Sequence, residues 1–271
     1  MGSDRAMKSP CNLTSDDNSS TAELRKRMDL FYQNTQDYSA FQTVNELPVQ
    51  WNYVRRAILS VLEKKPLCRV LEIGAGKSGF PGFVHDLKPS IHYTAQDVTR
   101  ANEEHLLAVA DTVHFHSIGQ IGGEFDVIFS TFVLEHITDP RQTLEKLFSS
   151  LSLGGKLFIF CPRYDFPFYL SHSADHYGTL RRLGIGLWLA LARLWACLMR
   201  RPLFLVHTDP AIFHLPVYRD RDAVHWTSLW DLEAFFRGRG RIESLKLTSG
   251  NTKDWIVKNL LQINVEITRM E

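Results

Sequence analysis

Two hydrophobic patterns alternate along the middle of the chain. Short runs of apolar residues, several with β-branched centres, are separated by longer segments in which apolar residues recur every three to four positions. The short runs are typical of strands buried in a parallel sheet, and the longer segments of helices packed on it. The strands are expected at 69–73, 91–96, 113–117, 125–130 and 156–160. This alternation predicts an α/β fold with helices on both faces of a parallel sheet.

The rest of the chain departs from this rhythm. The N-terminal stretch is rich in Ser, Asp, Asn and Thr, so it buries too little apolar surface to offset the entropy of ordering. An aromatic and apolar stretch interrupts the alternation after the fifth strand, before a helix at 229–236 and strands at 242–247 and 260–267. The predicted division is a disordered segment 1–22, a helical lid 23–66, a core 67–162 and 226–271, and a substrate-binding insertion 163–225.

Composition narrows the classes of protein. The chain has 271 residues, 44% of them hydrophobic, and a formal net charge of +1. So small a charge argues against a nucleic-acid partner, which requires a strongly basic surface. The four cysteines lie far apart and form no C-x-x-C pair, which indicates reduced thiols and a cytoplasmic location. His172 and His176 have the spacing of metal ligands on a helix but no third ligand nearby in sequence, so we predict no metal site.

Three glycines follow the first strand with the spacing G-x-G-x-x-G, from Gly74 to Gly79. Glycines at this place allow a tight turn and a close approach of the backbone to a ligand. A P-loop is excluded because Leu71 stands where its first glycine is required. A dinucleotide site remains open, since Asp97 has the spacing of the acid that binds a ribose. A third kind of site has an acid two residues before the first glycine, where this chain has Glu72.

Several segments together favour the third kind. Residues 71–76 resemble the first motif of class I S-adenosylmethionine (SAM)-dependent methyltransferases. Residues 125–140 resemble the fourth-strand motif of their small-molecule branch, which includes quinone-biosynthesis and natural-product-tailoring enzymes, and 151–157 are similar to the turn into strand 5. Residues 222–227 resemble, more loosely, the segment before the helix that precedes strand 6.

The resemblance implies a complete fold and a cofactor. The fold is a Rossmann-like, seven-stranded, mostly parallel sheet with an antiparallel last strand pair and a helical insertion after strand 5. The cofactor is SAM, with S-adenosylhomocysteine (SAH) as product. The residues placed at the cofactor are Glu72, Gly74, Ala75, Gly76, Asp97, Val98, Ser117, Ile118, Thr131 and Phe132.

The resemblance also gives these residues roles. The glycine loop would lie against the methionine part of the cofactor, with Glu72 orienting the loop and facing the cofactor's amino group. Asp97 would accept hydrogen bonds from both ribose hydroxyls. Many relatives have an acid after strand 3, and this chain has none there, so backbone groups or Gln120 would recognise the adenine.

The predicted function is methyl transfer to a small or mid-sized, partly hydrophobic acceptor, most often at a hydroxyl, in secondary or lipid- and quinone-like metabolism. His136 follows the fourth strand and is the candidate general base, with a purely structural role as the alternative. Two other functions stay open: an NAD-dependent oxidoreductase, which rests on the glycines and Asp97, and a scaffold without activity.

The insertion contains an apolar segment at 184–199 in which only Arg193 is charged. Arginine pairs at 181–182 and 200–201 flank it. At 16 residues it is shorter than the roughly 20 needed to span a bilayer. Three interpretations compete: a core helix, a wall of the acceptor pocket, and a peripheral membrane contact through residues 181–201.

Overall fold

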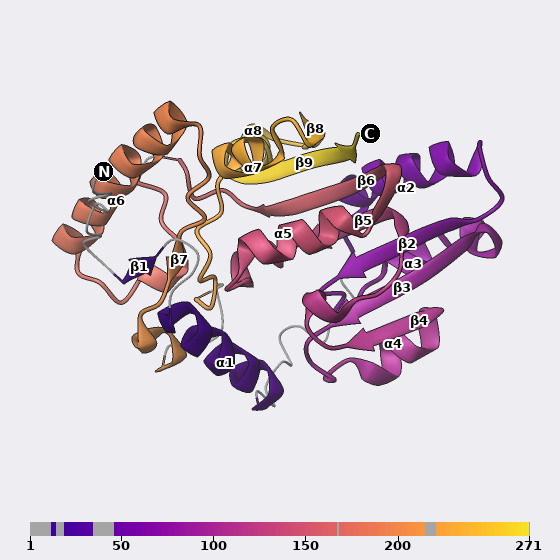
Figure 1. Ribbon diagram of the computed structural model, residues 1–271, viewed down its shortest axis with the longest axis horizontal. Coiled ribbons are helices and arrows are strands. Elements are labelled where there is room, and N and C mark those ends of the chain that lie inside the picture. Colours follow the sequence, from indigo (N-terminus) through magenta and orange to yellow (C-terminus); the bar gives the residue numbers. More distant parts are fainter. Residues whose placement is uncertain (1–11, 15–18, 35–45, 167, 215–220, 271) are drawn as a thin grey trace, which may run out of the picture.

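A seven-stranded sheet forms the centre of the molecule (Figure 1). The computed structural model describes residues 12–14, 19–34, 46–166, 168–214 and 221–270. The strand order is β4-β3-β2-β5-β6-β9-β8. The strands of this sheet are β2 (Cys68–Ile73), β3 (Ile91–Asp97), β4 (Thr112–Phe115), β5 (Phe125–Thr131), β6 (Leu151–Pro162), β8 (Gly240–Ser244) and β9 (Gln262–Arg269).

The pairing of these strands confirms the predicted fold class. β2 lies parallel to both β3 and β5, with Val70 opposite Tyr93 on one side and Val127 on the other. β4 and β6 extend the parallel array at its two sides. β9 runs antiparallel to β6 and to β8, so the last strand pair is the antiparallel one.

Adjacent residues of each strand serve opposite faces of the sheet, because side chains alternate along a strand. Val70 packs with α2, α3 and α4 on one face, whereas Leu71 packs with α5 and α7 on the other. Each face therefore has its own apolar core, as the unbroken apolar strands predict. The helices are α1 (Ser19–Asn34), α2 (Pro48–Leu62), α3 (Phe80–Phe83), α4 (Glu103–Val109), α5 (Pro140–Ser149), α6 (Thr179–Met199), α7 (Leu229–Phe236) and α8 (Thr252–Leu260). Short 3-10 turns are η2 (His85–Ser90), η3 (Ile118–Gln120), η4 (Leu134–His136), η5 (His172–Ala174) and η6 (Pro210–His214).

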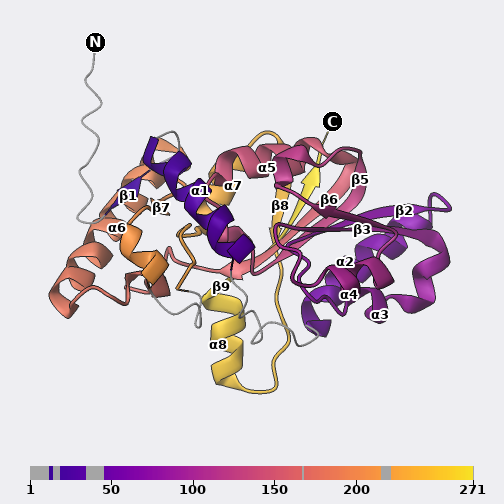
Figure 2. The ribbon, with the colours of Figure 1, turned by 90° about the horizontal axis from the view of Figure 1, so that it is seen from below.

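The insertion and the N-terminal helix form a lobe beside the sheet (Figures 1 and 2). The lobe contains α6 and the strand pair β1 (Leu13–Thr14) and β7 (Val206–His207). Leu24 and Met28 of α1 pack on Val206, Ile212 and Val224. The apolar side of the N-terminal helix therefore packs on the insertion.

The described residues of the N-terminal part differ from the predicted division in two places. Leu13–Thr14 pair with β7, and α1 begins at Ser19, so these parts of 1–22 are ordered by tertiary contacts. Residues 1–11 and 15–18 lie outside the described residues. The predicted lid 23–66 includes α2, which packs Val54 and Ile58 fully buried in the core and is no lid.

One helix was not expected. No helix was predicted between the strands at 242–247 and 260–267, and α8 lies there. The Asn251 side chain caps it by accepting a hydrogen bond from the Asp254 backbone N–H at 2.9 Å. Its apolar residues Trp255, Ile256 and Val257 are exposed, so the helix has no buried stripe that a hydrophobic pattern could reveal.

Candidate active site

The glycine loop leaves β2 in a conformation that requires glycine. Gly74 and Gly76 have φ of +62° and +54°. A Cβ on Gly74 would lie 2.4 Å from Cγ2 of Val133, which follows β5. The loop is therefore packed directly against the segment that leads to His136.

The neighbouring strand β3 holds this loop in place. The Ala75 backbone N–H donates to the Gln96 carbonyl oxygen at 2.9 Å, and the Gly76 N–H donates to Asp97 Oδ2 at 2.8 Å. Asp97 Oδ1 accepts from the Thr99 N–H at 3.0 Å. Burial raises the pKa of Asp97, while the backbone N–H groups of Thr99, Gly76 and Val98 act in the opposite direction. Asp97 is thus placed at the carboxyl end of β3, beside the loop, where a ribose carboxylate is expected.

Glu72, in β2, holds the end of the glycine loop through Ser78. Its Oε2 accepts from Ser78 Oγ at 2.9 Å and from Tyr93 Oη at 2.5 Å. Burial raises the pKa of Glu72 from 4.5 to about 7, the bonds from Tyr93 and Ser78 act to lower it, and the charge of Asp97 raises it further. Contact with the cofactor's amino group stays a prediction.

The Glu72→Gln variant is expected to lose a pH dependence of stability. Because the folded pKa of Glu72 lies above its ordinary value of 4.5, the folded protein binds more protons than the unfolded chain between 4.5 and about 7. The stability contributed by Glu72 is fully present below pH 4.5 and is lost as the pH rises through about 7. Glutamine mimics the protonated carboxyl, so the variant should gain up to about 3 kcal/mol relative to the wild type between about pH 5 and about pH 8. Urea unfolding of the cofactor-free wild type and variant at both pH values measures this gain. If the difference between their free energies of unfolding were the same at both pH values, the shifted pKa would be contradicted.

The residues predicted at the adenine differ in their exposure to a ligand. Val98 is 40% exposed and Ser117 is half-buried, so both are available to a ligand. The Ile118 side chain is buried in the core on the α5 face, which leaves only its backbone for the cofactor. Gln96 was not predicted: its Oε1 accepts from the Gly74 N–H at 3.3 Å, and its Nε2 donates to the His116 carbonyl oxygen at 2.7 Å.

The carboxyl end of β5 supplies the other side of the site. The Oγ1 atom of Thr131 is buried, and among the described residues it has no hydrogen-bond partner. Phe132 adopts φ of +56°, which a residue with a side chain rarely does. Its N–H donates to the Phe160 carbonyl oxygen at 2.7 Å. Such strain and unsatisfied polarity cluster at ligand sites, so these residues fit the cofactor.

His136 is held by a carboxylate that the sequence analysis did not identify. Its Nδ1 lies 3.2 Å from Asp222 Oδ2, and Tyr32 Oη donates to the same oxygen at 2.7 Å. Burial acts to raise the pKa of Asp222, but the charge of His136 and the hydrogen bonds from His136 and Tyr32 hold it below its ordinary value. The three residues come from α1, from η4 and from the end of the insertion, so no local pattern could have connected them.

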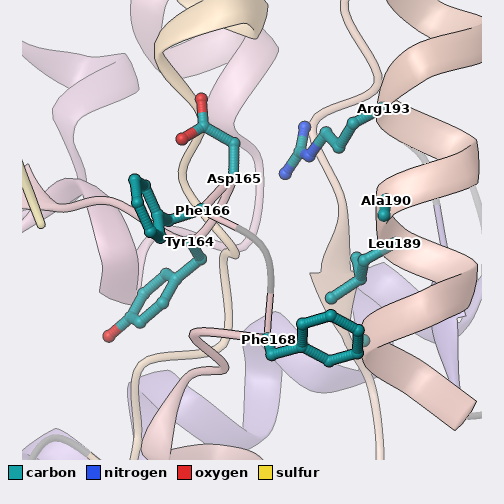
Figure 3. A pocket seen from close by; sticks show the side chains of 8 residues that line it. Tyr164, Asp165, Phe166, Phe168, Leu189, Ala190 and Arg193 are labelled. Carbon is teal, nitrogen blue, oxygen red and sulfur yellow. The ribbon is translucent and has the colours of Figure 1, made fainter. Parts of the chain in front are cut away.

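A small pocket lies between the chain after β6 and α6 (Figure 3). Phe168 forms one wall and packs so closely on α6 that a Cβ on Gly186 would meet its ring at 2.6 Å. The charged groups of the pocket serve the fold: Asp165 accepts from the Leu229 N–H at 2.9 Å, and Arg193 pairs with Asp231. The pocket is therefore an apolar recess with no catalytic group of its own among the described residues.

His172 and His176 do not face each other as a ligand pair. His172 Nδ1 lies 3.0 Å from Asp175 Oδ2. His176 Nε2 lies 3.3 Å from Asp209 Oδ2. Each histidine therefore has its own carboxylate partner within the insertion.

Three features together are those expected of a class I SAM-dependent methyltransferase: antiparallel β9 between β6 and β8, Glu72 before the glycine loop, and Asp97 at the end of β3. A family described as "Methyltransferase domain" matches residues 41–231, and the chain belongs to this family. The chain therefore contains a methyltransferase domain whose cofactor is SAM, as the sequence predicted. An NAD-dependent oxidoreductase and an inactive scaffold are set aside.

The individual relatives are distant. An uncharacterized protein from Synechococcus sp. is 36% identical over 103 residues, which are 34% of this chain and only 25% of that protein. The plantazolicin methyltransferase BpumL, in complex with a triazolic desmethylPZN analog and SAH, has a TM-score of 0.53 at 13% identity, over 93% of this chain and 98% of its own. The CurJ carbon methyltransferase has a TM-score of 0.49 at 16% identity, over 93% of this chain and 59% of its own. The BpumL likeness supports the fold.

Proposed function

We propose that the enzyme methylates a hydroxyl group of a small or mid-sized, partly hydrophobic acceptor, in secondary or lipid- and quinone-like metabolism, with His136 as the general base. The observation that carries this proposal is the contact between His136 Nδ1 and Asp222 Oδ2 at 3.2 Å. A hydroxyl must lose its proton as it takes the methyl group, whereas a carboxylate acceptor needs no base. A histidine oriented by a buried carboxylate suits that demand.

Each residue has one step in this proposal. Asp222 accepts a hydrogen bond from Nδ1–H of His136, which leaves the lone pair on Nε2. Nε2 then takes the proton of the acceptor hydroxyl while the hydroxyl oxygen attacks the methyl group. Such base catalysis contributes about 10²–10⁴ in rate. Bound SAM supplies an activated methyl group on a sulfonium. Tyr32 secures Asp222 from α1.

The segment after β6 supports an apolar acceptor. It belongs to the insertion and contains Phe166 and Phe168, which are 43% and 59% exposed. In a doubly wound sheet, ligands bind outside the carboxyl ends of the strands, and the glycine loop, η4 and the insertion all follow such ends. The acceptor would then lie between the lobe and the cofactor, with its apolar body on the insertion.

Three acceptors with one apolar body test the atom that is methylated. Naphthol, naphthylamine and naphthalenethiol differ only in the nucleophile, so the enzyme with isotopically labelled SAM should methylate naphthol fastest. Mass spectrometry of the products identifies the methylated atom. Preferred methylation of naphthylamine, or of a ring carbon of naphthol, would contradict a hydroxyl acceptor. The thiol ionises without assistance near neutral pH, so its rate reports positioning without the base.

A further inference from the structure

The helix α6 is apolar on both of its faces. Its inner face is buried in the lobe through Ile185, Leu189 and Ala196. Its outer face is exposed, and Leu180 and Leu198 are 87% and 70% accessible. The exposed apolar residues are Leu180, Leu183, Leu187, Leu191, Leu194, Trp195, Leu198 and Met199.

This outer face is a continuous stripe. Its leucines are spaced three or four residues apart, so they lie on one side of the helix. A surface helix of a globular protein normally has polar residues on that side. Figures 1 and 2 both place α6 at the outer edge of the lobe, and no described element covers the stripe. An exposed apolar surface of this extent marks an interaction site.

The charges around the stripe identify its partner. Thr179–Met199 contains no Asp or Glu, and Arg181, Arg182, Arg200 and Arg201 stand at its ends. Arginines in a first turn oppose the helix dipole, so the dipole does not account for Arg181 and Arg182. Arg182 Nη2 lies 3.5 Å from Asp175 Oδ1, with both side chains partly exposed. Arg181 is fixed over the Tyr177 ring, with its Cζ 3.9 Å from the ring centre. The matching partner has an apolar interior for the leucines and a negatively charged surface for the arginines at both ends of the helix.

A second copy of the chain fits less well. Pairing two α6 helices about a two-fold axis would place the arginines of one helix next to those of the other, with no acid on either helix to compensate. Anionic lipid headgroups instead offer the missing negative charge, and the cytoplasmic leaflet expected for this chain is rich in them.

In this fold, α6 could contact a membrane along its outer face but could not cross it. By length and composition α6 could span a bilayer, since it has 21 residues. However, Arg193 of its inner face is buried with Asp231 and donates to the Trp226 carbonyl oxygen at 2.6 Å. Inserting α6 across a bilayer would break this pair. The inner face thus stays on the protein while the outer face contacts lipid.

We propose that α6 is an interfacial helix that binds the enzyme to anionic membranes through its outer leucines, Trp195 and the flanking arginines. This proposal does not depend on the nature of the acceptor or on His136. A protein bound in this way would hold its insertion at the surface in which apolar metabolites accumulate.

Vesicle sedimentation of the full chain tests the proposal. The wild type should sediment with vesicles that contain phosphatidylserine, more weakly with phosphatidylcholine alone, and less at high salt. The Leu187→Glu/Leu191→Glu variant should bind at least about tenfold more weakly, because two apolar contacts are lost and negative charge is added. Leu107→Glu is the matched control: Leu107 lies on α4, is 61% exposed, and should leave binding unchanged.

Two further measurements separate the outcomes. Brominated lipids should quench tryptophan fluorescence in the wild type and less in Trp195→Phe. Circular dichroism and SAH binding must match the wild type in every variant, which the exposed positions permit. Equal vesicle binding by wild type and Leu187→Glu/Leu191→Glu would overturn the proposal. So would a wild-type dimer that ignores vesicles and is dissociated by the same substitutions, because α6 would then bind a second copy.

Discussion

Replacing His136 by alanine is expected to lower the rate of methyl transfer to a hydroxyl acceptor by about 10²–10⁴-fold. The variant lacks the imidazole that would take the proton, while the glycine loop and Asp97 are untouched. SAH affinity should therefore stay within a few fold of the wild type. Steady-state rates with labelled SAM and calorimetry with SAH measure the two quantities separately.

Two further variants, one at the partner of His136 and one at an exposed histidine elsewhere, provide the controls. Asp222→Asn removes the carboxylate charge but keeps its size, so it should shift the pH profile of the rate without weakening SAH binding. His92→Ala removes an exposed histidine of β3 whose Nε2 lies 3.0 Å from Thr112 Oγ1, and it should leave the rate unchanged. A near-normal rate for His136→Ala would make positioning alone the source of catalysis.

Replacing Asp231 by alanine is expected to lower the free energy of unfolding by about 3–5 kcal/mol, because the charge of Arg193 would stay buried without its counterion. Arg193 and Asp231 are both fully buried and join α6 to α7. Asp231 also accepts from the backbone N–H groups of Leu203 at 2.8 Å and of Phe204 at 3.2 Å. The Asp231 carboxylate thus joins α7 to α6 and to the segment that follows α6.

Chemical denaturation measures the loss, and an exposed ion pair calibrates it. Glu145→Ala breaks the contact between Arg239 Nη2 and Glu145 Oε2 at 2.6 Å, which is accessible to solvent and should cost at most about 1 kcal/mol. The Arg193→Met/Asp231→Leu variant removes both buried charges, so it should recover part of the stability. Equal losses for Asp231→Ala and Glu145→Ala would show that the buried pair contributes no more than a surface contact.

The sequence was sufficient for those parts of the site that one strand and its following turn define. Gly74, Gly76 and Asp97 could be placed because a strand, a turn and a spacing of about 20 residues are local patterns. Asp222 and Tyr32 could not, because they reach His136 from positions 86 and 104 residues away in sequence. The direction of the Ile118 side chain could not be predicted for another reason: its position at a strand end does not say which way a following 3-10 turn directs it.

Helices, too, could be predicted only where a local sequence pattern marks them. α7 buries one face and was predicted at its observed bounds, 229–236. α8 buries no residue, so only its capping residue Asn251 could have indicated it. α6 extends to Thr179, beyond the apolar segment that begins at Gly184, because Arg181 and Arg182 are part of its first turn.

The docking of α1 on the insertion fixes an order of events during synthesis. Leu24 and Met28 leave the ribosome early, but their partner Val224 is made about 200 residues later. Tyr32 likewise waits for Asp222, 190 residues further along the chain. The first helix to be made is therefore among the last to pack, and the carboxylate that orients His136 acquires its tyrosine only when the two ends of a long loop have met.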